Sequence, residues 1–393
     1  MTEEQNDNLT DHLEVPGSIL TRLVMRMNLA RTHNDALLGS ALLFIAVTFG
    51  PILILSVVDG FETGGLVDMP LHKDLITLSR YLVAAPILIL SDRLTRPWLV
   101  KAILRFLELV DREEIEAFKK MVRRIFQIRG SVLVDLVILV VCIASSFFLK
   151  SYSTNIDVSS WQTSMAGGVA DLSRPGFWNT FVSQPLFRFV VMSWTFDYIL
   201  WIYFLWRASR FRLNLIATHP DRAGGLSFVS AAHAQFCLAA FAIAAADSSV
   251  VAQLVQHTHQ DLKSFTHLGI VFLGVILLFF VGPLLVFSPT LVRIRLDGII
   301  SYGALCHELS DKFAAKWLRK RGDNEESILS SPDPSSLADL NSSFDTVLTM
   351  RSVVFDHQFV ILFVIATCLP ALPLIATVIP LQDLLMEILK ALT

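Results

Sequence analysis

The sequence predicts an all-α fold: a polytopic transmembrane helix bundle of about seven spans, with amphipathic cytoplasmic helical inserts. Hydrophobic residues make up 53% of the 393 residues and charged residues only 17%, whereas an average soluble domain is about 25% charged. Seven apolar runs approach the length of about 20 residues that a spanning helix needs. Lys and Arg residues alternate between dense and sparse connections along the chain. These three observations favour a multi-pass membrane protein.

The seven predicted spans lie at 38–58, 75–92, 131–149, 186–206, 229–250, 268–290 and 357–379. The second span is short and contains Arg80 and Pro86. The last contains Pro370 and Pro373, so we expect it to be either a kinked span or a re-entrant segment.

The distribution of basic residues orients these spans. Of the 32 Lys and Arg residues, 25 lie in the connections 1–37, 92–130, 207–227 and 292–355. Only five lie in the intervening connections and the C-terminal tail, and two lie within spans. In membrane proteins the cytoplasmic loops carry the excess of Lys and Arg. We therefore expect the N-terminus in the cytoplasm and, if the last segment spans, the C-terminus outside.

The same pattern divides the chain into four parts. Residues 1–37 form a cytoplasmic N-terminal segment, and residues 38–291 form the transmembrane bundle. Within the bundle, 93–130 has apolar residues at helical spacing and basic residues at both ends, which predicts an amphipathic helix or helical hairpin on the inner leaflet. Residues 292–355 form a helical cytoplasmic insert. Residues 356–393 hold the last transmembrane or re-entrant segment and the tail.

Three segments carry a resemblance to other proteins. They read "ISYGALCHELSDKFAAKWL", "SSLADLNSSFDTVLTMRSVVFD" and "LPALPLIATVIPLQDLL", and they follow the loop "HPDRAGGLSF" in that order. Over about residues 185–393 the chain resembles uncharacterised bacterial polytopic inner-membrane proteins that have an HPDRAGGL loop and a SLADL…MR cytoplasmic helix. The resemblance implies a location in the bacterial inner (plasma) membrane. It implies no activity and no catalytic residue.

Charged residues inside the predicted spans are the strongest functional candidates, because a charge in the bilayer costs free energy unless it is paired or used. Asp197, near the middle of the fourth span, is the first candidate. We interpret a set of five residues as an ion, proton or solute pathway, with Arg80 as a partner for Asp247: Asp197, Arg80, Arg188, His233 and Asp247. In the structural alternative, boundary charges reach the membrane surface and Asp197 bonds to hydroxyls that fix helix packing.

The stretch "IATHPDRAGGLSFVS", residues 216–230, separates the fourth and fifth spans. Its proline, aspartate and two glycines predict a turn. In the functional alternative, the loop binds an anion or a lipid headgroup through His219, Arg222, Gly224 and Gly225. The His-Pro-Asp triplet is also the signature of J-domains. A J-domain, however, needs a soluble helix after this loop, and here an apolar span follows.

His257, His259 and Asp261 form a weak candidate for a metal site, because two histidines and a carboxylate are ligands of divalent metals. No second ligand cluster accompanies them, so a solvated loop is the simpler interpretation, and we expect no metal or other cofactor. The four cysteines form no CxxC pair, and the sequence has no HExxH or GxGxxG pattern. The sequence therefore gives no support to an enzyme and assigns no catalytic residue.

Three function hypotheses follow from these features. The first is a channel or secondary transporter for an ion or small solute, with Asp197 in the pathway. The second is a non-transporting membrane scaffold or sensor whose cytoplasmic helices bind a partner or lipid headgroups. The third is a lipid-acting membrane enzyme, for which the sequence offers no recognisable set of catalytic residues. We expect contacts with the lipid bilayer and with anionic headgroups at the cytoplasmic face, expect no nucleic-acid partner, and leave a homo-oligomer open.

Overall fold

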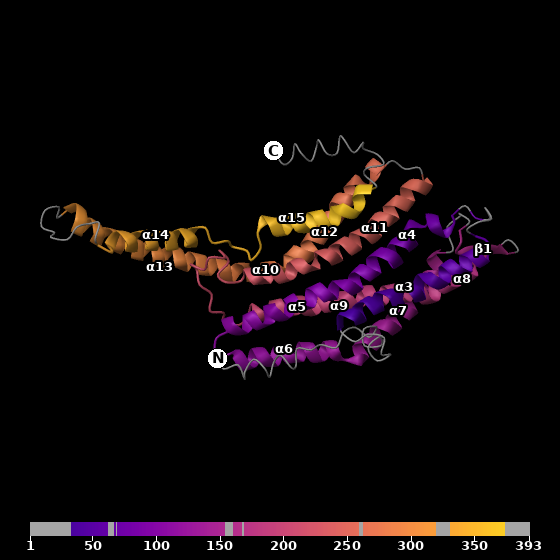
Figure 1. Ribbon diagram of the computed structural model, residues 1–393, viewed down its shortest axis with the longest axis horizontal. Coiled ribbons are helices and arrows are strands. Elements are labelled where there is room, and N and C mark those ends of the chain that lie inside the picture. Colours follow the sequence, from indigo (N-terminus) through magenta and orange to yellow (C-terminus); the bar gives the residue numbers. More distant parts are fainter. Residues whose placement is uncertain are drawn as a thin grey trace.

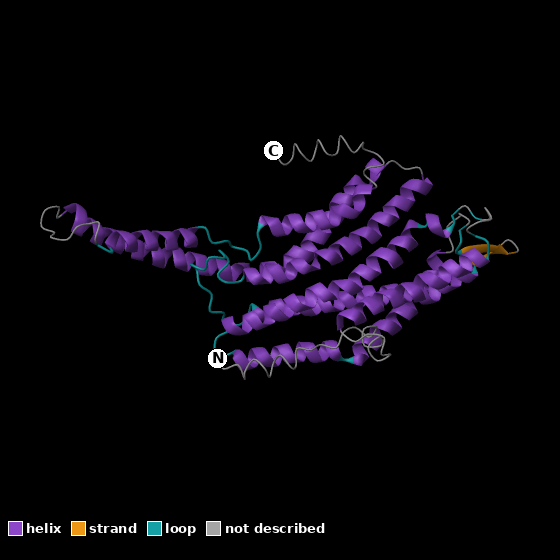
Figure 2. Ribbon diagram, viewed as in Figure 1, coloured by secondary structure: helices purple, strands orange, loops and turns teal. Residues whose placement is uncertain are grey.

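The computed structural model is almost entirely helical, with one short β-hairpin (Figure 2). It describes residues 33–61, 67, 69–153, 160–166, 169–258, 262–319 and 331–373. The α-helices are α3 (His33–Val58), α4 (Leu75–Leu78), α5 (Ala85–Leu109), α6 (Ile115–Gly130), α7 (Val132–Ser153), α8 (Arg174–Trp178), α9 (Gln184–Ala208), α10 (Ser227–His233), α11 (Cys237–Thr258), α12 (Thr266–Val281), α13 (Ser288–Ala314), α14 (Asp333–Leu348) and α15 (His357–Cys368). Short 3₁₀ and π-helical segments connect or extend them, namely η1 (Leu71–Lys73), η2 (Ser79–Ala84), η3 (Asn179–Ser183), η4 (Ala234–Phe236), η5 (Leu262–Phe265), η6 (Gly282–Phe287), η7 (Ala315–Arg319) and η8 (Leu369–Ala371).

Most of the long helices run side by side along the long axis of the molecule (Figure 1). α5 packs against α3, α9 and α11, and α7 packs against α9. α11 packs in turn against α15, which also contacts α12. Helices α13 and α14 pair into a hairpin that projects from one end of this bundle, and we name this hairpin the stalk. We call the end of the bundle from which the stalk projects the stalk end. The opposite end, the far end, carries the antiparallel strands β1 (Thr163–Ala166) and β2 (Val169–Leu172).

The candidate membrane spans support the predicted class but not its full count. Five helices are long and apolar enough to cross a membrane, namely Leu37–Val58, Leu75–Leu109, Arg174–Ala208, Ser227–Gln256 and Thr266–Arg319. A sixth candidate is a pair of helices bent by 46°, Ile115–Gly130 and Val132–Phe147. The last predicted span is a shorter apolar helix, His357–Ala371, and residues 374–393 lie outside the described part. The described residues thus give five or six candidate spans, and the expected seven are not confirmed.

The 93–130 segment takes the hairpin form of the two expected alternatives. α5 continues well beyond the predicted second span, the chain turns, and α6 runs back along the bundle (Figure 1). The side chains that α6 buries against the bundle include Phe118, Met121 and Val122. Its exposed basic side chains include Lys120, Arg123 and Arg124. One face of α6 is therefore part of the protein core, while the opposite face keeps the predicted positive charge.

Three of the four basic connections meet at the stalk end. The backbone N–H of Asn214 donates to the carbonyl of Leu109 at 2.8 Å, which joins the loop after α9 to the turn after α5. The backbone N–H of Arg351 donates to the carbonyl of Arg222 at 2.7 Å, which joins the end of the stalk to the same loop. These three connections, which are rich in Lys and Arg in the sequence, thus lie together at one end of the folded bundle.

A cluster of buried and half-buried phenylalanine rings fixes the helices near this end. Phe106 of α5 packs against Phe204 of α9, Phe228 of α10 and Phe287 of η6, with ring centroids 5.5, 5.0 and 5.8 Å apart. Phe118 of α6 adds an edge-to-face contact with Phe204 at 6.0 Å. Aromatic pairs of this kind add to the free energy of area burial. The cluster sets the spacing of α5, α6 and α9, which enclose the cavity of the candidate site.

A backbone carbonyl that a proline leaves without its donor inside α3 is hydrogen-bonded by a side chain from another segment. Pro51 lies inside α3 and has no N–H to donate to the carbonyl of Val47. The indole N–H of Trp178, at the end of α8, donates to that oxygen at 3.0 Å. Because an unsatisfied carbonyl is costly within a membrane, this bond holds α3 against the start of the long helix that includes α9.

Candidate functional site

The centre of the candidate site is an ion-pair cluster that joins three helices. Nε of Arg129, at the end of α6, forms an ion pair with Oδ1 of Asp197 on α9. Nη1 of the same arginine lies 3.2 Å from Oδ1 of Asp135 on α7. Arg129 and Asp135 are almost fully buried, whereas the side chain of Asp197 keeps an exposed part. The first sequence candidate is therefore paired, and its partner is a residue that the sequence analysis did not select.

The bend between α6 and α7 brings Arg129 and Asp135 together. α6 ends at Gly130, and Ser131 has extended backbone angles (φ −72°, ψ 120°), so α7 begins in a new direction. This break turns two residues that are six positions apart toward one another. A buried guanidinium needs such carboxylate partners, because an unpaired charge in a poorly solvated interior is strongly unfavourable.

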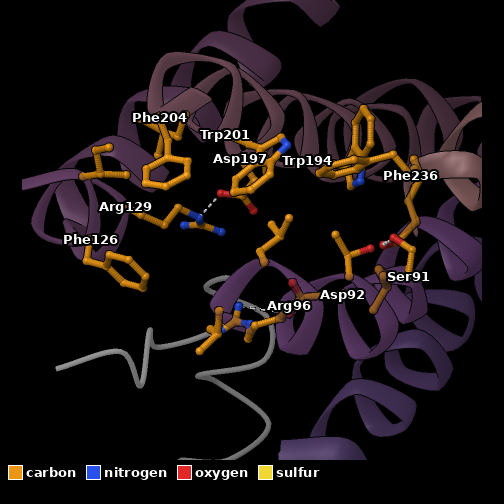
Figure 3. A pocket seen from close by; sticks show the side chains of 18 of the residues that line it. Ser91, Asp92, Arg96, Phe126, Arg129, Trp194, Asp197, Trp201, Phe204 and Phe236 are labelled. Carbon is orange, nitrogen blue, oxygen red and sulfur yellow. Dashed lines mark hydrogen bonds and ion pairs between the residues drawn. The ribbon is translucent and has the colours of Figure 1, made fainter. Parts of the chain in front are cut away.

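A half-open cavity of about 180 Å³ lies beside this cluster, between α5, α6 and α9 (Figure 3). Its wall is mostly apolar and includes the aromatic residues Phe126, Trp194, Trp201, Phe204 and Phe236. Figure 3 shows the Asp197 carboxylate beside Trp201, with one oxygen joined to Arg129. The geometry therefore places a carboxylate in the wall of a mostly apolar cavity.

The opposite wall carries a second ion pair and a hydroxyl. Asp92 and Arg96, one turn apart on α5, pair at 2.9 Å and both line the cavity. The hydroxyl of Thr95 on the same helix is buried and has no hydrogen-bond partner, and the same is true of Ser193 on α9. Buried polar groups normally have partners. A molecule with polar atoms in this cavity would supply them.

The partnership expected between Arg80 and Asp247 is not formed among the described residues. The guanidinium of Arg80 instead lies over the ring of Phe187, 6.0 Å from its centroid. Arg188 also lacks a carboxylate among the described residues and uses neutral acceptors, namely Ser145 and Ser146 at 3.0 Å and Gln184 at 2.9 Å. Neither arginine lines the cavity beside Asp197. The structure therefore does not bring these three residues into one site with Asp197, and their role in a pathway stays a prediction.

His233 takes part in a closed hydrogen-bond network. Its Nδ1 accepts from the indole N–H of Trp201 at 3.1 Å, and its Nε2 lies 3.2 Å from the hydroxyl of Tyr198. That hydroxyl donates to the carbonyl of Phe279 at 2.8 Å, which Pro283 leaves without a backbone donor. Because the tyrosine proton is used there, Nε2 carries the imidazole proton. Both ring nitrogens are thus satisfied within the bundle, which favours a packing role for His233.

The loop of residues 216–230 is organised around Asp221. Its Oδ1 accepts from the backbone N–H groups of Ala223 and Gly225 at 2.8 and 3.0 Å, and its Oδ2 accepts from Ser227 at 3.0 Å. Burial alone would raise the pKa of Asp221, but these three bonds, with a contribution from His219, outweigh it and lower the pKa. The turn interpretation is confirmed.

The same bonds bear on the predicted anion site. An internal carboxylate already occupies the Gly225 amide, one of the donors expected to cradle a phosphate. The positive backbone angles at Arg222 (φ 55°), Gly224 (φ 66°) and Gly225 (φ 96°) serve this wrapping of the chain around Asp221. His219 lies beside the carboxylate, with Nδ1 2.8 Å from Oδ1. The geometry thus favours a structural loop over an anion or headgroup site.

Arg351 joins this loop to the stalk and to the last described helix. Its Nη2 donates to the carbonyl of Asp221 at 3.0 Å, and its Nη1 lies 3.6 Å from Oδ2 of Asp356. Asp356 caps α15 by accepting from the backbone N–H of Phe359. The arginine of the "TMR" sequence is therefore a link between three segments, and no spacing rule in the sequence indicates it.

A second polar network at the far end was also not anticipated. Asp74 is buried and accepts from Thr77, from the indole N–H of Trp161 at 3.1 Å and from Gln162 at 3.2 Å. The carbonyl of the Gln162 side chain accepts from Asn179, 3.4 Å away, whose own Oδ1 accepts from the hydroxyl of Tyr81 at 2.6 Å. Tyr81 and Asn179 lie in the π-helical segments η2 and η3. The network fixes these two irregular segments against the loop that follows α7.

The weak metal candidate remains untested. His259 and Asp261 lie outside the described residues, and the side chain of His257 is not described. Among the residues that the structure does describe, no group of three or more His, Cys, Asp or Glu side chains has the arrangement of a metal site.

Comparison with known proteins adds no relative to this description. No family model matches the chain, no curated protein matches it, and no solved structure matches it. The class that the fold and the site define is a helical membrane protein with a charged, half-open cavity in its bundle. The resemblance to uncharacterised bacterial membrane proteins stays a prediction.

Proposed function

We propose that this chain is an inner-membrane channel or secondary transporter for an ion or small solute, and that Asp197 lies in its pathway. The observation that carries the proposal is the half-open cavity between α5, α6 and α9, with the partly exposed carboxylate of Asp197 in its wall. Ionisable residues within membrane spans are costly and are associated with substrate and ion pathways. The bacterial inner membrane is part of the same proposal and rests on the resemblance to uncharacterised bacterial membrane proteins. The cytoplasmic location of the N-terminus and the stalk end rests on the charge alternation.

Flux through purified protein in proteoliposomes tests this function. We expect wild-type protein to take up protons or a small solute, and we expect Asp197→Asn to lose most of that uptake. Asp297→Asn is the control, since Asp297 is an exposed carboxylate in a candidate span and does not line the cavity. Absence of flux for common ions and solutes from an oriented, folded sample would remove the transporter proposal. Reporter fusions after residues 215 and 393 test the orientation.

A scaffold or sensor is the second candidate, and the stalk favours it. Val292, Leu296 and Ile300 form an exposed apolar stripe along one face of α13, at intervals of one helical turn. An exposed stripe of this kind on a projecting hairpin is typical of an interaction surface. We expect Leu296→Glu with Ile300→Glu to change the sedimentation or the partner binding of a scaffold, and to leave the flux of a transporter unchanged.

A further inference from the structure

We propose that the cavity between α5, α6 and α9 binds a small organic cation with an apolar body, such as an aryl- or alkylammonium ion. The inference rests on the proposed function only in taking this cavity as the binding site, and it names the class of ligand. Three features of the cavity lead to it: which charges face the cavity, what surrounds them, and how much room there is.

The exposed fractions of the ionic side chains show which charge the cavity presents. In the Arg129–Asp197 pair the arginine is 8% exposed and the aspartate 39%. In the Arg96–Asp92 pair the arginine is 22% exposed and the aspartate 33%. In both pairs, therefore, the carboxylate is more open than its guanidinium. The more accessible member of each pair is thus the carboxylate, which favours a cation over an anion as the ligand.

The Arg129 cluster strengthens this polarity. One guanidinium is shared between two carboxylates, Asp135 and Asp197, so its charge is not given to Asp197 alone. Oδ1 of Asp197 is the buried oxygen of the ion pair, and the exposed part of the side chain is the part that faces the cavity. A positive group placed there would complete the neutralisation of the carboxylate.

The rest of the wall is mostly apolar and aromatic, which suits a carbon-rich ligand. Trp194 and Trp201 line the cavity together with Asp197, and indole faces attract ammonium groups as well as hydrocarbon. The unpartnered hydroxyls of Thr95 and Ser193 offer hydrogen bonds to a polar substituent. A cavity of about 180 Å³ has room for a single ring with a short substituent, since a cavity of roughly 150 Å³ holds benzene.

Three probes of the same shape and different charge test the proposal on the full chain in nonionic detergent. The cation is phenyltrimethylammonium, the neutral isostere is tert-butylbenzene, and the anion is benzenesulfonate. Binding is followed by titration calorimetry and by the fluorescence of the tryptophans that line the cavity. We expect saturable binding of the cation, with at least tenfold weaker binding of the other two probes. Equal affinity for cation and neutral isostere, or no saturable binding, would overturn the proposal.

Variants locate the binding. We expect Asp197→Asn to weaken cation binding at least tenfold and to leave the neutral probe unaffected, whereas the control Asp297→Asn, at an exposed carboxylate outside the cavity, binds like wild type. Leu99→Trp places a large side chain in the cavity wall without touching an ionic residue, and it should abolish binding. If Asp197→Asn does not fold, the Leu99→Trp result still decides whether the cation occupies this cavity. Cation binding that survives in Leu99→Trp contradicts the site.

The two proposals fail separately. If the cation binds saturably and in dependence on Asp197 but no flux is found, the proposed ligand class stands and the transporter proposal fails. Flux of another solute, with no binding of the ammonium probe, keeps the transporter and removes the ligand class.

Discussion

Arg129 of α6 and Asp197 of α9 form an ion pair in the wall of the cavity, and the same guanidinium bonds to Asp135 of α7 at 3.2 Å. A single side chain therefore ties three helices together. Because Arg129 and Asp135 are almost fully buried, neither charge can turn to water when its partner is removed. The position of α6, and with it one wall of the cavity, depends on this residue.

Replacing Arg129 tests that dependence. We expect Arg129→Met to lower the free energy of unfolding by about 3 kcal/mol, because removing one partner of a buried ion pair leaves the other desolvated and unpaired. Thermal unfolding in detergent measures the loss. Arg212→Met is the control: Arg212 pairs with Glu113 on the surface, and we expect a change of at most about 0.5 kcal/mol. Equal losses in the two variants would contradict the structural role of the cluster.

The hydrogen bonds of the Tyr198 hydroxyl lead us to expect a second measurable loss of stability. Tyr198→Phe leaves the carbonyl of Phe279 without its donor and removes the hydroxyl contact of Nε2 of His233, so we expect a cost of about 1–3 kcal/mol. Melting temperatures of the purified variants measure it. Tyr203→Phe, which removes an exposed hydroxyl on the same helix, should melt like wild type. A Tyr198→Phe protein that melts at the wild-type temperature would show that the network is not intact in solution.

Pro51 and Trp178 predict a coupling that a double-mutant cycle can measure. Trp178→Phe removes the donor to the Val47 carbonyl and should cost about 1 kcal/mol or more. Pro51→Ala restores a backbone N–H that can bond to the same oxygen. We therefore expect Trp178→Phe to cost less in the Pro51→Ala background. Strict additivity of the two substitutions would mean that the indole bond does not compensate for the proline.

Asp221 predicts a dependence of stability on pH. Because its hydrogen bonds lower the pKa of Asp221 in the folded protein, its contribution is complete above the unfolded pKa of about 3.9. The contribution is lost as the pH falls through the lower folded pKa. We expect Asp221→Asn to be destabilised by about 1–3 kcal/mol at neutral pH, and to converge on wild type as the pH falls below about 4.

Melting temperatures measured between neutral pH and pH 3 check this expectation. Asp339→Asn, at an exposed position on α14, is the control and should follow the wild-type curve. A gap between wild type and Asp221→Asn that stays constant over the whole range would contradict the assignment of the pH dependence to this carboxylate.

Hydrophobicity and charge along the chain predicted the architecture because both are properties of local segments. The helical class follows from apolar runs, and the meeting of the basic connections at one end follows from their alternation. The turn at residues 216–230 was predictable for the same reason, since proline, aspartate and glycine act on the backbone near them. The span count was less secure, because a bent helix pair and a short last helix do not have the length of an ideal span.

For the candidate site, the sequence predicted one residue of the ion pair and not its partner. Asp197 could be selected from the sequence, because a carboxylate in an apolar run is costly wherever the helix lies. Its partner was not selected: Arg129 continues the buried stripe of Phe118 and Val122 on α6. Only the packing of α6 and α7 against α9 decides that this arginine meets Asp197 and Asp135. The pairing expected for Arg80 and Asp247 fails for the same reason, since the rotation of each helix decides which neighbours its side chains meet.

The sequence by itself therefore determined the class of protein, the helical segments and the residue with the strongest reason to be functional. The tertiary structure decided which charges pair, that Asp221 fills its own loop, and that a cavity lies beside Asp197. The physical reason is that burial and turn formation depend on residues near one another in the chain. Ion pairs and cavities depend on helix packing, which brings together side chains far apart in the sequence.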